Sequence, residues 1–364
     1  MTPLWSCALP LPETPSPRVL RVVRELWAQV VERPAWAGPI VSEGLRAART
    51  LGSKERPVAG DMLLGMIRHH RALAHLAGLQ EPGASLGLLD AWMQLAEQGV
   101  PELPDPDDAY AMATSVPAAL AGAWWRRLGA SRARAHAIAL AGRAPVALRV
   151  LRGPVELPVP AAPAGAHGLV LEGRCNLDTV PAAREGRVIV QDLGSQCIVD
   201  AAWAWAREVG AAPRVLDLCA GAGGKSLALA ALGARVQAWD VRPDALRELS
   251  RRASRANLRV EVGAPRAGSR FDLVLVDAPC SGTGVLRRHP ENRWKLRFPV
   301  EAQAELLSRA CTLAPRVVYA TCSLAEEENE QLVRSVAGAP RSETTTWPAD
   351  GAGEGFYWAE VGGE

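Results

Sequence analysis

The chain of 364 residues contains almost no lysine and few phenylalanines or tyrosines. Only Lys54, Lys225 and Lys295 occur among 41 basic residues, and Phe and Tyr appear three times each. The basic residues are balanced by 39 acidic ones, which gives a formal net charge of +2. Charge over the whole chain therefore indicates no polyanionic partner, and any nucleic-acid site must be a local basic patch. Because arginine replaces lysine nearly everywhere, each lysine requires an explanation.

Cysteine pairs of the kind that hold a metal are also missing. Seven cysteines are scattered along the chain without any C-x-x-C spacing, which argues against a zinc site and against a disulfide framework. No apolar run reaches membrane-spanning length, and residues 1–17 lack the basic start and apolar core of a signal peptide. We therefore expect no metal, no membrane partner and a reducing, cytoplasmic setting.

The length predicts two domains, or three small ones. Apolar residues recur with helical spacing from residue 18 to about 140, interrupted by a proline-rich acidic loop at 99–108. The pattern then changes to short extended pieces over 146–151 and 155–159, followed by a loose stretch at 160–168. We place the domain boundaries at 1–141, 142–200 and 201–364.

Strand and helix patterns alternate from Val199 onward. Four short apolar runs, each followed by a helical pattern or a loop, predict strands at 215–219, 236–240, 271–277 and 317–320. This alternation predicts an α/β fold with a doubly wound, mostly parallel sheet. Ligands of such sheets bind beyond the carboxyl ends of the strands. The residues at those ends are Cys219, Asp240, Asp277 and Thr321.

A glycine-rich turn follows the first of these strands. It consists of Cys219, Ala220, Gly221, Ala222, Gly223, Gly224, Lys225 and Ser226. The spacing fits neither a P-loop nor a complete dinucleotide fingerprint, and a sterically required strand-to-helix turn is the alternative. Asp240 lies 17 positions after Gly223, near the separation at which an acid reaches a ribose diol. The turn therefore predicts a ribose-bearing cofactor, with a helix cap as the alternative role of Asp240.

Two cysteines lie in loops that follow the third and fourth strands. Cys280 and Cys322 are flanked by proline, serine and threonine, whereas Cys311 lies in an apolar run typical of a buried, inert thiol. Adjacent parallel strands can bring the two loops together. Thiolates form near a cation, and Lys225 is a candidate for that cation, with a solvated surface lysine as the less favoured alternative. Cys280 and Cys322 are therefore candidate reactive groups.

Basic and aromatic residues interleave soon after Cys280. Such a segment suits phosphates and splayed bases, although a solvated basic loop has the same composition. The candidate RNA-binding residues are Arg287, Arg288, His289, Arg293, Trp294, Lys295 and Arg297.

These motifs, taken together, resemble those of RNA cytosine-C5 methyltransferases of the bacterial RsmB (Fmu/Sun) type and their Nop/Sun relatives. The likeness rests on Asp277-Ala-Pro-Cys-Ser-Gly-Thr-Gly284 and Tyr319-Ala-Thr-Cys-Ser323, in this order, and on the preceding Gln191-Asp-Leu-Gly-Ser-Gln196. It runs from about residue 142 to the end of the sequence. The stretch from Lys54 to Arg68 is more weakly similar to the NusB-like helical domain that precedes this catalytic domain in the bacterial enzymes.

The resemblance implies a Rossmann-like methyltransferase domain with S-adenosylmethionine as cofactor. We expect the substrate to be RNA, ribosomal RNA rather than transfer RNA, and the enzyme to be a monomer. It implies that Cys322 adds to C6 of cytosine, that Cys280 assists release of the product, and that Asp277 binds the edge of the base. Lys225 joins this catalytic set. The residues implied to hold the cofactor are Cys219, Ala220, Gly221, Ala222, Gly223, Gly224, Lys225, Asp240 and Asp277.

The sequence departs from the family pattern around the adenine of the cofactor. Residues 261–266 contain no aspartate, position 245 is alanine in place of an arginine, and Gly221-Ala222 replaces Ala-Pro. These changes bear on cofactor affinity more than on cysteine chemistry, so a catalytically silent RNA-binding or ribosome-assembly protein is the alternative function. A nicotinamide oxidoreductase is disfavoured because the third glycine of the fingerprint is missing.

Overall fold

The fold was analysed in a computed structural model that describes residues 15–79, 85–98, 111, 114–351 and 353–362. Cys7 and the expected acidic loop at 99–108 lie outside this part of the chain. The chain forms two compact units. The helical unit comprises Met1–Ala144 and Val285–Leu296, and the sheet unit comprises Pro145–Gly284 and Arg297–Glu364. The segment 285–296, expected within the last domain, therefore belongs to the helical unit.

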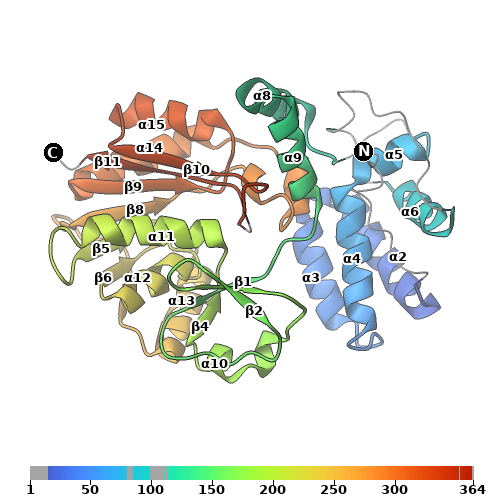
Figure 1. The fold of residues 1–364 in the computed structure, drawn as a ribbon, viewed down its shortest axis with the longest axis horizontal. Helices are drawn as coiled ribbons and strands as arrows, with labels where there is room; N and C mark the ends of the chain where they lie inside the picture. The colour runs from blue at the N-terminus through green and yellow to red at the C-terminus, as the bar shows by residue number, and fades with distance from the viewer. Residues whose placement is uncertain (1–14, 80–84, 99–110, 112–113, 352, 363–364) are drawn as a thin grey trace. The chain divides into compact units, whose positions relative to one another are not determined.

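The helical unit (Figure 1) is built from amphipathic helices around an apolar core that contains Trp27, Met62, Met66 and Trp92. Its α-helices are α2 (Pro17–Glu32), α3 (Ala37–Ala47), α4 (Glu55–Arg68), α5 (His70–Leu76), α6 (Gly87–Gln98), α8 (Ala118–Leu128) and α9 (Ala130–Ala141). The helix expected over 19–31 is confirmed as α2. Ser16 caps it by accepting a hydrogen bond from the Val19 amide, and Pro17 occupies its first turn.

Segment 285–296 is held inside the helical unit by one ring and several hydrogen bonds. Its short 3-10 helix η4 (Pro290–Trp294) places Trp294 against the core, 5.1 Å from the His70 ring between centroids. Arg68 donates to the carbonyl of Arg287 at 3.0 Å. These contacts explain why the segment leaves the sheet unit, although its sequence looks like a surface loop.

The sheet unit begins with a small antiparallel sheet in the order β2-β3-β1-β4. Its strands are β1 (Ala147–Val150), β2 (Ala161–Ala164), β3 (Gly168–Leu171) and β4 (Val188–Val190), with the short helix α10 (Pro181–Arg184) before β4. The expected extended piece at 155–159 forms no strand, and β2 lies instead in the stretch expected to be loose. Pro163 is compatible with β2 because this strand is at the sheet edge, where no ladder donor is required.

The large sheet has seven strands in the order β10-β11-β9-β8-β5-β6-β7 (Figure 1). The strands are β5 (Arg214–Asp217), β6 (Arg235–Ala238), β7 (Val260–Val262), β8 (Leu273–Asp277), β9 (Arg316–Thr321), β10 (Ser342–Thr346) and β11 (Phe356–Gly362). Strands β5 to β9 run parallel, and β10 and β11 add antiparallel pairs. The predicted Rossmann-like α/β fold is confirmed. Strands β7 and β10 were not predicted.

Helices cover both faces of this sheet. They are α11 (Leu193–Ala206), α12 (Gly224–Leu232), α13 (Pro243–Ala256), α14 (Val300–Leu313) and α15 (Glu330–Ala337). Helices α12 and α13 pack on β6 and β7, whereas α14 and α15 pack on the other face, over β8, β9 and β11. Strand β8 is buried along Leu273–Val276, which explains its unbroken apolar sequence. No helix of the described residues is long and apolar enough to cross a membrane.

Candidate active site

The register of the two central strands brings the two cysteine loops together. Asp277, the last residue of β8, lies beside Ala320 near the end of β9, so the loops that follow start side by side. The sulfur atoms of Cys280 and Cys322 are 3.3 Å apart, and both residues are half-buried. The sequence predicted this proximity from the parallel order of the strands. The geometry lets one thiol donate a hydrogen bond to the other sulfur.

A buried carboxylate lies beneath the Cys280 loop. Glu328, in the short 3-10 helix η5 (Glu326–Glu328), is fully buried. It accepts hydrogen bonds from the Ser281 amide at 2.8 Å, the Ser281 hydroxyl at 2.6 Å and Gln303 Nε2 at 3.0 Å. Sequence reasoning missed Glu328, because the run of three glutamates at 326–328 looks like the solvated start of a helix. Only the fold shows which of them points inward.

The Cys322 loop is held in the same way by neutral side chains. Asn329 Nδ2 donates to the carbonyl of Ser323 at 2.9 Å, and Asn329 Oδ1 accepts from the Thr321 hydroxyl at 2.6 Å. The Gly284 amide donates to the carbonyl of Cys322 itself at 2.9 Å. Each cysteine is thus flanked by backbone groups with fixed partners, and its sulfur atom is the part left to react.

Lys225 and Asp277 form an ion pair at the same edge of the sheet. Lys225 Nζ lies 2.6 Å from Asp277 Oδ2, and the lysine is 8% exposed. Burial opposes the charged form of Lys225, but the carboxylates of Asp277 and Asp217 outweigh it and raise the pKa of Lys225. The amine is therefore a fixed cation that is bonded to Asp277, which explains why a lysine is retained here.

Two thiols of the sheet unit, those of Cys280 and Cys219, have raised pKa values. The hydrogen bond with Cys322, burial and the Glu328 charge raise the pKa of Cys280 well above its usual range. Burial, followed by the carboxylate of Asp217, raises the pKa of Cys219 to about 12. Both residues are neutral thiols at neutral pH. Cys311, expected to be buried, is exposed, because its position in α14 faces away from the sheet.

The glycine turn after β5 has the backbone geometry that the sequence predicts. Gly221 and Gly223 have φ angles of 53° and 83°, and a Cβ on Gly223 would lie 2.5 Å from Leu249 Cγ. The Gly221 amide donates to Asp240 Oδ2 at 2.8 Å, which ties the turn to the end of β6. Arg242, not anticipated from the sequence, donates to Asp240 Oδ1 through its amide and its Nε, both at 2.9 Å.

A second buried acid, Asp217, lies under the turn. Its Oδ2 accepts from the Ser226 hydroxyl at 2.6 Å, whereas Oδ1 has no hydrogen-bond partner among the described residues. Burial raises the pKa of Asp217 to about 6. The carboxylate has almost no exposed surface, which explains why burial is the largest cause of this shift. Asp217 was not among the predicted site residues.

The predicted RNA-binding residues do not form one exposed surface. Arg293 is buried, and its guanidinium donates to the carbonyls of Leu286 at 2.7 Å and Leu140 at 3.0 Å. Burial, with Arg68 nearby, lowers its pKa to about 9. Arg287 is also buried. The Arg293 guanidinium thus binds backbone carbonyls of the helical unit, and RNA binding by these residues stays a prediction. Arg288, His289, Trp294 and Lys295 are at least partly exposed in the helical unit, and Arg297 is exposed in the sheet unit.

Among the described residues, no group of acidic, histidine or cysteine side chains is arranged to hold a metal ion.

Comparison with known proteins finds a family that part of the chain matches. Residues 208–343 match the family model described as 16S rRNA methyltransferase RsmB/F. A ribosomal RNA small subunit methyltransferase B from Erwinia tasmaniensis is 34% identical over 231 residues, which cover 54% of this chain and 52% of the relative. The same protein from Proteus mirabilis is 32% identical over 218 residues, covering 54% and 50%. The chain thus spans about half the length of these curated relatives.

Solved structures support the fold over a longer range. The crystal structure of PH0851 matches with a TM-score of 0.74 at 20% identity, and covers 96% of this chain and 99% of its own. A methyltransferase homologue from Pyrococcus horikoshii matches with a TM-score of 0.60 at 21% identity, and covers 72% and 100%. The RsmB-type resemblance of the motifs is confirmed for residues 208–343. The NusB-like character of the helical unit stays a prediction.

Proposed function

We propose, from the RsmB/F-family domain at residues 208–343, that the chain is an S-adenosylmethionine-dependent RNA cytosine-C5 methyltransferase acting on ribosomal RNA. The observation that carries the proposal is the pair of thiols, Cys280 and Cys322, 3.3 Å apart at the strand edge that also holds the Lys225–Asp277 pair. Cytosine C5 is a poor nucleophile and requires covalent activation, which a thiolate provides.

Cys322 acts as the nucleophile in this proposal. Its thiolate forms a bond to C6 of cytosine, and the electron pair of the C5–C6 double bond moves toward C5 and the ring edge. The carboxyl group of Asp277 binds that edge, while Lys225 keeps its orientation fixed. Bound S-adenosylmethionine supplies an electrophilic methyl group for C5. The target base must be unpaired or flipped out to reach the sulfur.

Cys280 acts in the release step. The C5 proton must then leave, the C6–S bond must break, and Cys322 must depart as a thiolate. The hydrogen bond with Cys322 is the largest cause of the raised pKa of Cys280. Because Cys322 becomes a thioether in the adduct, this cause disappears, and Cys280 loses its own proton to solvent more easily. Its thiolate then takes the C5 proton, and the C5–H electron pair re-forms the C5–C6 double bond and expels Cys322 as a thiolate. Once the C6–S bond breaks, the Cys280 thiol can again donate to the departing sulfur.

The residues present fit the cofactor. Gly224 has open space where a Cβ would lie, which lets a ligand approach the backbone of the turn, and Asp240 presents a carboxylate suited to a ribose diol. The exposed Arg242 side chain forms an ion pair with the Asp240 carboxylate, so a ribose has to displace this contact or share the carboxylate with it. This competition and the absence of an aspartate in 261–266 predict modest cofactor affinity.

A trapping experiment tests the proposal. Incubation with S-adenosylmethionine and a ribosomal RNA transcript that contains 5-fluorocytosine should yield a covalent protein–RNA complex, because fluorine cannot leave C5 as a proton does. Cys322→Ala should abolish the complex. Cys280→Ala should accumulate a complex with ordinary RNA. If neither wild type nor Cys322→Ala forms a covalent complex with this RNA, the protein is an RNA-binding protein without this chemistry.

A further inference from the structure

No helix of the described residues covers the face of the large sheet opposite α12 and α13 at β6 and β7. We call this helix-free part the open face, although Gln237 in the middle of β6 is buried there and donates to the carbonyl of Gly263. The other parallel connections contain a helix, but residues 263–272, between β7 and β8, form none. Leu216 of β5 points to the face that α14 and α15 cover. Its register partners, Val274 of β8 and Gln237 of β6, therefore point to the same face. Since α14 packs on β8 and β9, the same face is left open farther along, at β6 and β7.

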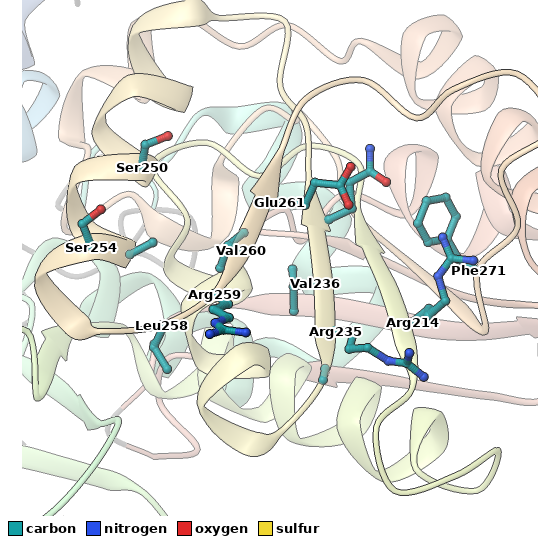
Figure 2. Close-up of a pocket in the computed structure, with 13 residues that line it drawn as sticks. Arg214, Arg235, Val236, Ser250, Ser254, Leu258, Arg259, Val260, Glu261 and Phe271 are labelled. Carbon is teal, nitrogen blue, oxygen red and sulfur yellow. The ribbon is translucent and has the colours of Figure 1, made fainter.

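Three arginines lie in a row across this open face. Arg214 is the register partner of Arg235, and the pairing of Val236 with Val260 sets Arg259 beside Arg235. Register partners on neighbouring parallel strands point to the same face, and the strands are about 4.8 Å apart. All three arginines are exposed (Figure 2). The next row contains a single acid, Glu261.

No acidic side chain of the described residues forms an ion pair with these guanidinium groups. Arg214 lies over the Phe271 ring at 5.4 Å, and Arg235 Nε donates to the carbonyl of Ala212 at 3.0 Å. The nearby Asp272 carboxylate accepts instead from the Arg214 amide. Like charges on neighbouring strands repel. The row therefore has an electrostatic cost that a bound anion removes.

The surroundings extend the positive charge and add ring surface. The arginines border a hollow of about 560 Å³, whose lining includes Phe271 and Gln237 and also Ser250 and Ser254 of α13. Arg266 and Arg270, in the connection 263–272, are exposed as well. Arg309 of α14 lies over the Trp239 ring at 5.2 Å on the same face. Guanidinium groups bind phosphate through paired hydrogen bonds, and aromatic rings next to them suit bases.

We propose that this face, defined by Arg214, Arg235 and Arg259, binds the phosphate backbone of the RNA substrate. The inference rests on the proposed function for the identity of the RNA. The three arginines precede or begin their strands, whereas Asp277 and the two thiols lie at or beyond the opposite ends. The surface is therefore a second anchoring site that contributes to RNA affinity and not to the chemical step.

Binding of a fluorescently labelled, mixed-sequence single-stranded RNA tests the proposal. The triple variant Arg214→Gln, Arg235→Gln, Arg259→Gln should bind roughly 10-fold more weakly at physiological salt, and its salt slope should fall by about 2, at about 0.7 per phosphate contact. The matched control is Arg247→Gln, Arg251→Gln, Arg334→Gln, whose three exposed arginines already pair with Asp244, Glu248 and Glu343. Thermal melting checks that both variants fold.

Equal affinity and equal salt slope in the two triple variants would overturn the proposal. Displacement of the RNA by polyglutamate at lower concentration than by unlabelled RNA would also overturn it, because the surface would then fit an acidic protein. Full displacement by inorganic phosphate at millimolar levels would assign the site to a free anion. Loss of RNA affinity in the triple variant, with no 5-fluorocytosine complex in wild type, would uphold the surface and refute the proposed reaction.

Discussion

The two halves of the strand edge are built differently. The loops after β8 and β9, which carry the thiols, are fixed by buried side chains such as Glu328 and Asn329. The loops after β5 and β6, at the cofactor end, are held by the Gly221 amide, by the exposed Arg242 and by Arg252, which donates to the carbonyl of Ala222 at 2.7 Å. This difference teaches that buried acceptors set the position of the two sulfur atoms, whereas two arginines outside the core hold the glycine turn and Asp240, and one of them competes with a ribose.

The strongest test of the comparison is the removal of Glu328. Glu328→Ala leaves the Ser281 amide and Gln303 without their buried acceptor, so we expect a loss of about 3 kcal/mol in the free energy of unfolding. Urea denaturation measures it. Glu327→Ala, at the exposed neighbouring position, is the control and should change stability by less than about 0.5 kcal/mol. Similar effects of the two substitutions would show that the thiol loops do not depend on the buried carboxylate.

The second test uses the pH dependence of stability. The folded-state pKa of Asp217 is about 6 against a usual 3.8, so protonation stabilises the fold at low pH, and this stabilisation disappears as pH rises to about 6. Asp217→Asn has no such titration. Its stability relative to wild type should therefore increase by up to about 3 kcal/mol between about pH 4 and about pH 6. Urea denaturation at several pH values measures the trend, and a constant difference would contradict it. Asp244→Asn, on an exposed side chain, is the control.

The third test concerns the cofactor end. Asp240→Asn removes the charge that the ribose diol would meet, and we expect S-adenosylhomocysteine to bind about 10-fold more weakly. Isothermal titration calorimetry measures it, with Asp244→Asn again as control. Unchanged binding would mean that Asp240 serves only the glycine turn.

The smallest effect is expected at Arg242. Its side chain is 69% exposed, so its ion pair with Asp240 contributes little to stability. Because it competes with the ribose for Asp240, Arg242→Gln should bind S-adenosylhomocysteine about two- to threefold more tightly. Weaker binding in the same titration would show that Arg242 contacts the cofactor itself.

The sequence predicted those features that follow from strand order and failed where burial decides. The meeting of Cys280 and Cys322 follows from two neighbouring parallel strands, and the glycine turn follows from its spacing. The burial of Glu328 has no local signal, because its neighbours are also acidic. Strand β7 has only three residues, including an exposed Glu261, which hides its pattern. Arg287 and Arg293 have the composition of a solvated loop, and only the structure shows that both are buried and that the Arg293 guanidinium donates to backbone carbonyls.

Segment 285–296 has a consequence for how the molecule can be divided. The chain enters the sheet unit at Pro145, returns to the helical unit at Val285 and crosses back at Arg297. A fragment cut before Pro145 would still contain the Trp294 ring and the Arg293 guanidinium but none of the helices that receive them. The two units are therefore not independent modules. A fragment that contains the sheet unit alone would expose the Trp294 ring, which normally packs on the helical core, shortly after the loop that carries Cys280.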